Sequence, residues 1–270
     1  MTTTNIPLDG PINLHARAGH GSLTVTAEDG VSEAMVTLEP NLEDSDVAQR
    51  TSVELRGHTL FVTAPRRGGI FDTGLFGGPS RDRDDMDITI TVPSGTAMKL
   101  SSFTADIRVL GRSGSADIAS GASDVELAEI DGDLRLRLAS GTAHVVQVTG
   151  SVEARSGSGV ATFGEIGGSL SSGCGSGRLE VGIVRGDVRS RSGSGTALLG
   201  AVYGDVDLSS GSGQVEIGLP AGHSVRLDVT TGSGRVNSEL PIEDAPTEAG
   251  PKLSIRARTG SGNIRLFRAA

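Results

Sequence analysis

The sequence predicts an all-β fold, a parallel β-solenoid built from coils of about 18 residues. Three observations lead to this prediction. A glycine-led tripeptide recurs at constant spacing, a Ser-Gly pair recurs at the same spacing, and apolar residues alternate with polar ones inside each repeat. Glycine is abundant, with 40 residues. A disordered glycine-rich linker would have no reason to keep such a register, so the periodicity favours a folded repeat.

The first marker is a glycine followed by Asp or Ser and then by a small or aliphatic residue. It occurs 18 residues apart at Gly114, Gly132, Gly150, Gly168, Gly186 and Gly204. The second marker is the pair that begins at Ser140, Ser158, Ser176, Ser194 and Ser212, and it returns at Ser233 and Ser261. Eighteen residues hold two strands and two corners but no helix. Each coil is therefore expected to pair with the next through parallel strands about 4.8 Å apart.

Inside each coil the residues alternate, as in Asp205-Val206-Asp207-Leu208, which is typical of a strand with one buried face. Stacking the repeats predicts four inward rows, whose outward neighbours are mostly polar, with Leu198 as an exception. The rows are Leu134, Val152, Leu170, Val188, Val206; Ala143, Ala161, Leu179, Ala197, Val215; Val145, Phe163, Val181, Leu199, Ile217; and Ile130, Val148, Ile166, Val184, Val202.

The corners are expected to need glycine because the chain turns there with positive φ. Near the corner a further row combines Ser156, Cys174, Ser192 and Ser210. Cys174, the only cysteine, takes the place of a serine in this row. We interpret it as a structural thiol rather than a reactive one, since no basic residue occupies a matching position.

The ends are less regular. We expect residues 1–92 to form an N-terminal β cap with the first coils, and residues 93–270 to form the regular solenoid, as one continuous domain. Residues 14–25 resemble one coil, and strands are expected at 34–39, 52–55, 60–63, 86–92 and, as the last strand, 264–267. A proline-rich insertion covers residues 240–251. We expect right-handed coils, as in most β-strand crossovers.

A second insertion, the loop 66–85, is the most informative departure from the repeat. It places Ile70, Phe71, Leu75 and Phe76 in a glycine-rich segment that ends in mixed charge. These four residues are the candidate partner-binding site, because loops that carry aromatic side chains are common contact sites. In the alternative interpretation the same side chains pack against the cap.

The bulk composition excludes several function classes. A net charge of −9 and a pI near 5.1 disfavour binding to nucleic acid or anionic lipid. No apolar run is long enough to span a membrane, and the N-terminus does not resemble a signal peptide. We therefore expect a cytoplasmic protein, with surface exposure left open for export by another route.

No catalytic, cofactor or metal site is expected. The Gly-Ser-Gly segments lack the lysine and the helix of a phosphate-binding loop, and neither a nucleophile elbow nor an H-E-x-x-H motif occurs. The histidines are scattered; His15 and His20 are the closest pair, without a visible third ligand. The aspartates at 82, 84, 85 and 87 lack the glycine and glutamate of an EF-hand loop. We therefore expect the protein not to be an enzyme.

One family resembles this chain over residues 10–270. The likeness lies in Val92-Pro93-Ser94-Gly95, in the recurring S-G-S-G-x-A/V-x-L coils, and in the closing Leu219-Pro220-Ala221-Gly222 and Thr231-Gly232-Ser233-Gly234 segments. These motifs are similar to the bacterial "putative adhesin" β-strand-repeat domain, a family of unknown function that resembles a single-stranded β-helix. The resemblance implies this architecture and an adhesin-like role, and it provides no catalytic residues.

The sequence thus predicts a structural or protein-interaction scaffold that binds a protein partner. Two alternatives remain open: a structural element that self-assembles into oligomers, and a ligand-binding or carbohydrate-active β-helix.

Overall fold

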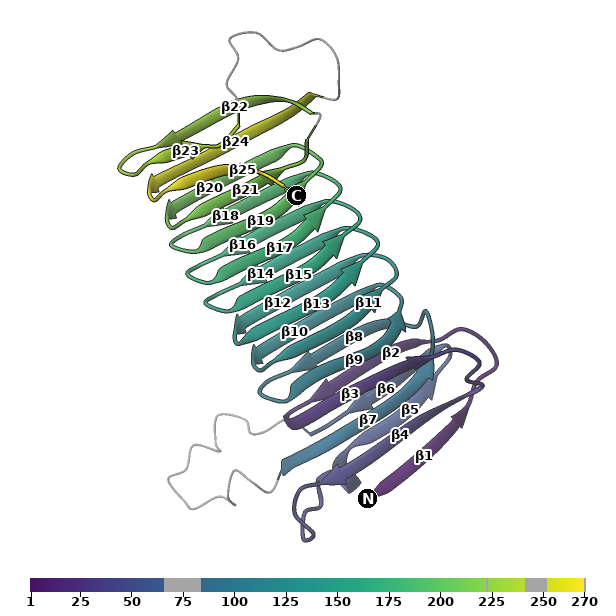
Figure 1. Ribbon diagram of the computed structural model, residues 1–270. Coiled ribbons are helices and arrows are strands. Elements are labelled where there is room, and N and C mark those ends of the chain that lie inside the picture. Colours follow the sequence, from purple (N-terminus) through teal and green to yellow (C-terminus); the bar gives the residue numbers. More distant parts are fainter. Residues whose placement is uncertain (66–83, 222, 241–251, 270) are drawn as a thin grey trace, which may run out of the picture. The chain divides into compact units, whose positions relative to one another are not determined.

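The computed structural model describes residues 1–65, 84–221, 223–240 and 252–269. The chain forms two compact units, Met1–Asp131 and Gly132–Ala270 (Figure 1). In both units strands stack in parallel in two facing sheets, which confirms the predicted β-solenoid. Each regular coil contributes one strand to each sheet.

The first unit contains one short helix, α1, and strands β1 to β11. They are β1 Thr2–Pro7, β2 Asn13–Ala18, β3 His20–Glu28, β4 Glu33–Pro40, α1 Val47–Arg50, β5 Ser52–Arg56, β6 Thr59–Thr63, β7 Asp85–Pro93, β8 Ala97–Ser102, β9 Asp106–Ser113, β10 Ala116–Ala122 and β11 Val125–Ile130.

The second unit contains the most regular coils. Its strands are β12 Leu134–Ser140, β13 Thr142–Val148, β14 Val152–Ser156, β15 Val160–Ile166, β16 Leu170–Cys174, β17 Arg178–Val184, β18 Val188–Ser192, β19 Thr196–Val202, β20 Val206–Ser212, β21 Val215–Leu219, β22 Ser224–Thr231, β23 Val236–Ser238, β24 Lys252–Ser261 and β25 Ile264–Arg268.

The register of the second unit matches the predicted rows. Leu134 pairs with Val152, Val152 with Leu170, and the row continues through Val188 and Val206. All residues of the four predicted inward rows are buried. Phe163 is the largest side chain among them, and a coil this narrow accommodates it because Ala143 and Ala161 lie nearby in the neighbouring row. Apolar burial of stacked rows is therefore what holds consecutive coils together.

The reason expected for glycine at the corners is wrong for most regular coils. Gly132, Gly141 and Gly213 do have positive φ, but the other glycines of the two markers do not. Close stacking explains them instead. A Cβ atom added to Gly159 would lie 2.6 Å from the carbonyl oxygen of Gly141 in the preceding coil. Glycine is needed there because successive backbones approach too closely for any side chain.

The polar row near the corner stabilises the turn through hydrogen bonds to the backbone. Ser156, Cys174, Ser192 and Ser210 share one register. Backbone N–H groups three residues ahead donate hydrogen bonds to the side chains, with lengths of 2.9 Å at Ser156, 3.0 Å at Cys174 and 2.7 Å at Ser192. The thiol of Cys174 thus accepts the same bond as a serine hydroxyl, in agreement with the structural interpretation of this residue.

The last coil of the chain is not the last coil of the stack. Strand β24 pairs with β20 on one side and with β22 on the other, and β25 lies in the same way between β21 and β23. The chain therefore skips one level after β21, forms β22 and β23, and returns to fill the vacant level (Figure 1). The strand expected at 264–267 is present as β25, but it lies inside the sheet.

A similar rearrangement occurs in the first unit. Strand β2 lies between β6 and β8, and β3 lies between β7 and β9, all in parallel. The residues that resemble a coil, 14–25, thus do form one, and it is enclosed by two coils that come later in the sequence. Beyond β7 the pairing becomes antiparallel, through β4 and then β1, and β5 pairs antiparallel with β6.

Candidate functional site

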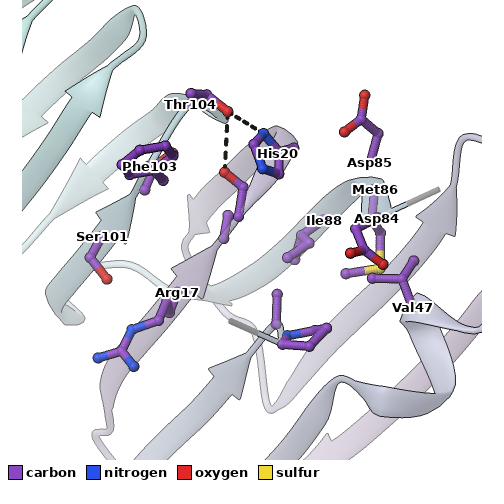
Figure 2. Close-up of a pocket in the computed structure, with 15 residues that line it drawn as sticks. Arg17, His20, Val47, Asp84, Asp85, Met86, Ile88, Ser101, Phe103 and Thr104 are labelled. Atoms are coloured by element: carbon purple, nitrogen blue, oxygen red, sulfur yellow. Dashed lines mark hydrogen bonds between the residues drawn. The ribbon is translucent and has the colours of Figure 1, made fainter. Parts of the chain in front are cut away.

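A pocket of about 900 Å³ opens at one corner of the first three coils of the first unit (Figure 2). It is formed by the β2–β3 corner, the end of β6, the start of β7, the β8–β9 corner and helix α1. Its lining residues are Arg17, Ala18, Gly19, His20, Val47, Ala64, Pro65, Asp84, Asp85, Met86, Ile88, Ser101, Ser102, Phe103 and Thr104.

The pocket exists because the corners of these coils differ in length. Strands β2 and β3 are joined by Gly19 alone, whereas β8 and β9 are joined by residues 103–105. Between β6 and β7 the short corner is replaced by residues 64–84. Regular coils close their corners against one another, so unequal corners leave a hollow between neighbouring levels.

The floor of the pocket is apolar. Ala18, Val47, Ala64, Met86 and Ile88 line it, and each is buried. Ala18 of β2 and Ala64, which follows β6, are small and leave room, while Met86 contributes a flexible thioether that adapts to irregular shapes. A cavity of this size and character suits an apolar group of a ligand or of a partner protein.

The rim carries polar and aromatic groups. Nδ1 of His20 lies 2.5 Å from Oγ1 of Thr104, and the His20 ring meets the edge of Phe103 with ring centroids 6.3 Å apart (Figure 2). Phe103 is 69% exposed. An exposed aromatic ring fixed beside an apolar hollow offers contact area at a low cost in conformational entropy.

Charges of opposite sign flank the pocket. Figure 2 shows Arg17 on one side and Asp84 and Asp85 on the other. Asp84 forms an ion pair of 2.5 Å with Arg50, and the hydrogen bond to Asp84 is the main reason why the pKa of the Arg50 guanidinium is raised above its ordinary value. Arg17 forms no ion pair with any residue that the structure describes.

The groups at the pocket do not form a recognisable catalytic arrangement. Within the described part of the chain, no carboxylate hydrogen-bonds to the His20 ring, and no three His, Cys, Asp or Glu side chains gather as metal ligands. The His15 ring packs against the Phe61 ring with centroids 5.1 Å apart. Asp87 accepts a hydrogen bond of 2.7 Å from Ser22.

The partner-binding residues predicted from the sequence, Ile70, Phe71, Leu75 and Phe76, lie outside the described residues. Most of the insertion 240–251 does as well. The residues that flank the first segment are informative, because Pro65 and Asp84 both line the pocket. The pocket itself was not predicted; the interruption of a corner by the loop 66–85 was the one sequence signal that pointed to this place.

A model of the Toastrack DUF4097 family matches residues 22–267. Among curated proteins, none matches the sequence. No helix in the described ranges is long and apolar enough to cross a membrane.

Three solved structures are similar to this chain to different degrees. A putative lipid binding protein from Parabacteroides distasonis is 13% identical with a TM-score of 0.57, covering 98% of this chain and 96% of that chain. A putative adhesin from Parabacteroides merdae is 14% identical with a TM-score of 0.48, covering 98% and 95%. A putative adhesin from Bacteroides fragilis is 15% identical with a TM-score of 0.44, covering 98% and 96%. At this level of identity, the first of these similarities shows a shared fold.

Proposed function

This chain belongs to the Toastrack DUF4097 family, and we propose that it is a non-enzymatic scaffold that binds a protein partner through the pocket of its first unit. The observation that carries the proposal is the combination of a buried apolar floor with the exposed ring of Phe103 at the rim. Interfaces concentrate their binding energy in aromatic anchors beside desolvated pockets. Solenoids provide rigid supports for such sites, because each coil is held by its neighbours.

The four residues Ile70, Phe71, Leu75 and Phe76 belong to this proposal as additional contacts. The segment that contains them begins and ends at residues that line the pocket. A partner seated in the pocket would therefore lie next to both points where this segment leaves the coils. This supports one continuous binding surface, on which the segment and the pocket act together.

The experiment is site-specific photo-crosslinking from position 103, with a crosslinking phenylalanine analogue in place of Phe103, in cells of the native organism. The test variant is Gly19→Phe. Gly19 lines the pocket, and a Cβ atom there meets nothing nearer than the Pro65 carbonyl oxygen at 3.9 Å, so we expect a phenylalanine side chain at this position to occupy part of the pocket. Gly10→Phe is the matched control, since a Cβ atom there meets nothing within 4 Å and Gly10 lies outside the pocket.

We expect one protein adduct that forms in the parent and with Gly10→Phe and disappears with Gly19→Phe. An adduct that persists with Gly19→Phe would mean that the partner does not use the pocket. Adducts with a second copy of this chain alone would favour the self-assembling structural element instead.

A second candidate function is the binding of an amphiphilic small molecule. The apolar floor of the pocket favours it, as does Arg17 at its edge, with which no described residue forms an ion pair, because an acyl chain and an acidic headgroup would use both. One structure of similar fold bears the name of a putative lipid binding protein. Titration of a fluorescent fatty acid with the protein tests this. A change in the probe's fluorescence with wild type but not with Gly19→Phe would support it, and no change with either protein would exclude it.

A further inference from the structure

Arginines gather on the outward face of one sheet of the second unit, in a chain whose net charge is −9. The sheet has the order β12, β14, β16, β18, β20, β24. One column of outward positions crosses it in strict register, and we call it the arginine column. It consists of Arg137, Arg155, Gly173, Arg191, Ser209 and Arg258. No carboxylate occurs in the column, and its two positions without arginine are small.

Part of the positive charge of the column has no ion-pair partner within the described residues. Arg155 forms an ion pair of 3.0 Å with Glu153, and Arg258 one of 3.1 Å with Asp228. Arg191 forms none with any residue in the described ranges, and neither does Arg189 beside it in the same strand. The Arg155 and Arg258 side chains stay 72% and 59% exposed in spite of their partners. Exposed pairs of this kind are weak, so a strong anion can replace the carboxylate.

Three of the four arginines in the column recur at a defined interval. Arg155, Arg191 and Arg258 lie on every second coil, because Gly173 and Ser209 occupy the coils between them. With about 4.8 Å between neighbouring parallel strands, these three guanidinium groups follow one another at about 10 Å along the stack, and Arg137 lies one coil beyond Arg155. A partner that matches this column carries an anionic group at a similar interval along a straight chain.

A flat polar strip borders the column on the side of the corner. The first part of the strip is a column of exposed glycines that includes Gly175 and Gly193. A Cβ atom on Gly175 would lie 2.6 Å from the carbonyl oxygen of Gly157, and one on Gly193 would lie 2.8 Å from that of Gly175. Next come the exposed serines Ser158, Ser176 and Ser194, whose hydroxyls bond to no residue in the described ranges. The strip therefore offers free hydroxyl groups beside a surface without side chains.

We propose that the arginine column and this strip bind an anionic polysaccharide with a carboxylate on every second sugar. The arginines face the carboxylates, and the serine hydroxyls exchange hydrogen bonds with the sugar hydroxyls. Other polyanions fit less well. Phosphates follow at about 3.4 Å per strand in nucleic acid, and same-side carboxylates of an extended acidic peptide at about 7 Å. The surface lies in the second unit and is independent of the pocket.

The test uses the full-length protein and a ten-sugar fragment of hyaluronan, in which glucuronate alternates with a neutral sugar. Binding is measured by titration calorimetry at low and at high salt. The test variant is Arg155→Ser with Arg191→Ser. The matched control is Arg178→Ser with Arg185→Ser, which removes the same charge from exposed positions outside the arginine column. Unchanged thermal unfolding shows that both variants fold.

We expect wild type and the control to bind equally, the test variant to bind roughly tenfold more weakly, and binding to weaken as salt rises. Absence of binding to hyaluronan overturns the proposal, as does equal loss in both variants. Oligothymidylate, polyglutamate and vesicles with anionic lipid serve as competitors of other classes. Tighter binding to any one of them overturns the assignment to a polysaccharide.

Discussion

Asp205 accepts a hydrogen bond of 2.8 Å from the backbone N–H of Ser254, a residue 49 positions further along the chain. In the regular coils the equivalent bond spans 18 positions, as from the N–H of Asp205 to Asp187. The same turn contact therefore continues across the point where the chain leaves the sequential order of coils. Strand β24 is therefore the direct neighbour of β20, and the last two strands of the chain, β24 and β25, lie inside the stack.

This arrangement predicts an unusual response to truncation. A chain that ends at residue 251 lacks β24 and β25, which among the described strands are the only pairing partners of β22 and β23. We expect residues 224–238 to lose protection from hydrogen exchange completely. The complementary deletion of residues 224–251 removes the outer coil alone, and we expect β24 and β25 to keep their protection against β20 and β21. Equal protection of residues 224–231 in the truncated and intact chains would contradict the topology.

A change of polarity should strongly reduce stability at an inward position and have little effect at an outward one. Val206 is 2% exposed between Val188 and Ile255, whereas Asp207 is exposed. Val206→Asp introduces an unpaired charge among apolar neighbours and should lower the free energy of unfolding by about 3–5 kcal/mol. Asp207→Val should change it by less than about 0.5 kcal/mol. Urea denaturation followed by circular dichroism measures both, and equal effects would disprove the assignment of faces.

Two glycines that are two residues apart should also differ. A methyl group on Gly175 would lie 2.6 Å from the Gly157 carbonyl oxygen, whereas one on Gly173 meets nothing within 4 Å. Neither glycine has positive φ. Gly175→Ala should therefore cost about 1–3 kcal/mol through overpacking, and Gly173→Ala should stabilise by about 0.4–1 kcal/mol through the unfolded chain. Thermal unfolding distinguishes them. A loss of stability in Gly173→Ala as large as in Gly175→Ala would show that close stacking is not the cause.

The outermost strand of the second unit should loosen in acid. The hydrogen bond from Arg258, with help from Arg256, holds the pKa of Asp228 below its ordinary value of 3.8. A lowered pKa in the folded state means that the contribution of Asp228 is complete above pH 3.8 and is lost as the pH falls below it. The protection of residues 224–231 against hydrogen exchange should be lower at pH 3 than at pH 6 in wild type. The difference in protection between the two pH values should be smaller in Asp228→Asn. An identical pH response in the two would exclude this ion pair as the cause.

The regular coils could be predicted from the sequence because their signals are local. An alternation of polar and apolar residues identifies the inward face of each strand, and a constant spacing places Val206 beside Val188 without further information. The role of Cys174 followed in the same way, since its register with Ser156 and Ser192 was visible in the repeat. In these parts, neighbours in sequence are also neighbours in the stack.

The rest depends on relations that no local pattern carries. The positions of β2 and β24 within the stack could not be predicted, because a coil fits equally well in several levels by pattern alone. Glycine is needed at position 159 because the backbone of the preceding coil lies close to it, and not because of its own φ. The pocket, likewise, results from unequal corners brought together by the order of coils, so only the loop 66–85 hinted at it.

The central claim is that the chain acts as a monomeric scaffold which binds a partner, rather than as a unit of a larger assembly. Light scattering over a wide concentration range tests it most directly, on the intact chain and on one without residues 68–83. We expect a constant monomer mass for both proteins. A mass that grows with concentration in the intact chain, and no longer grows without the segment, would contradict the claim and make self-assembly the function of this surface.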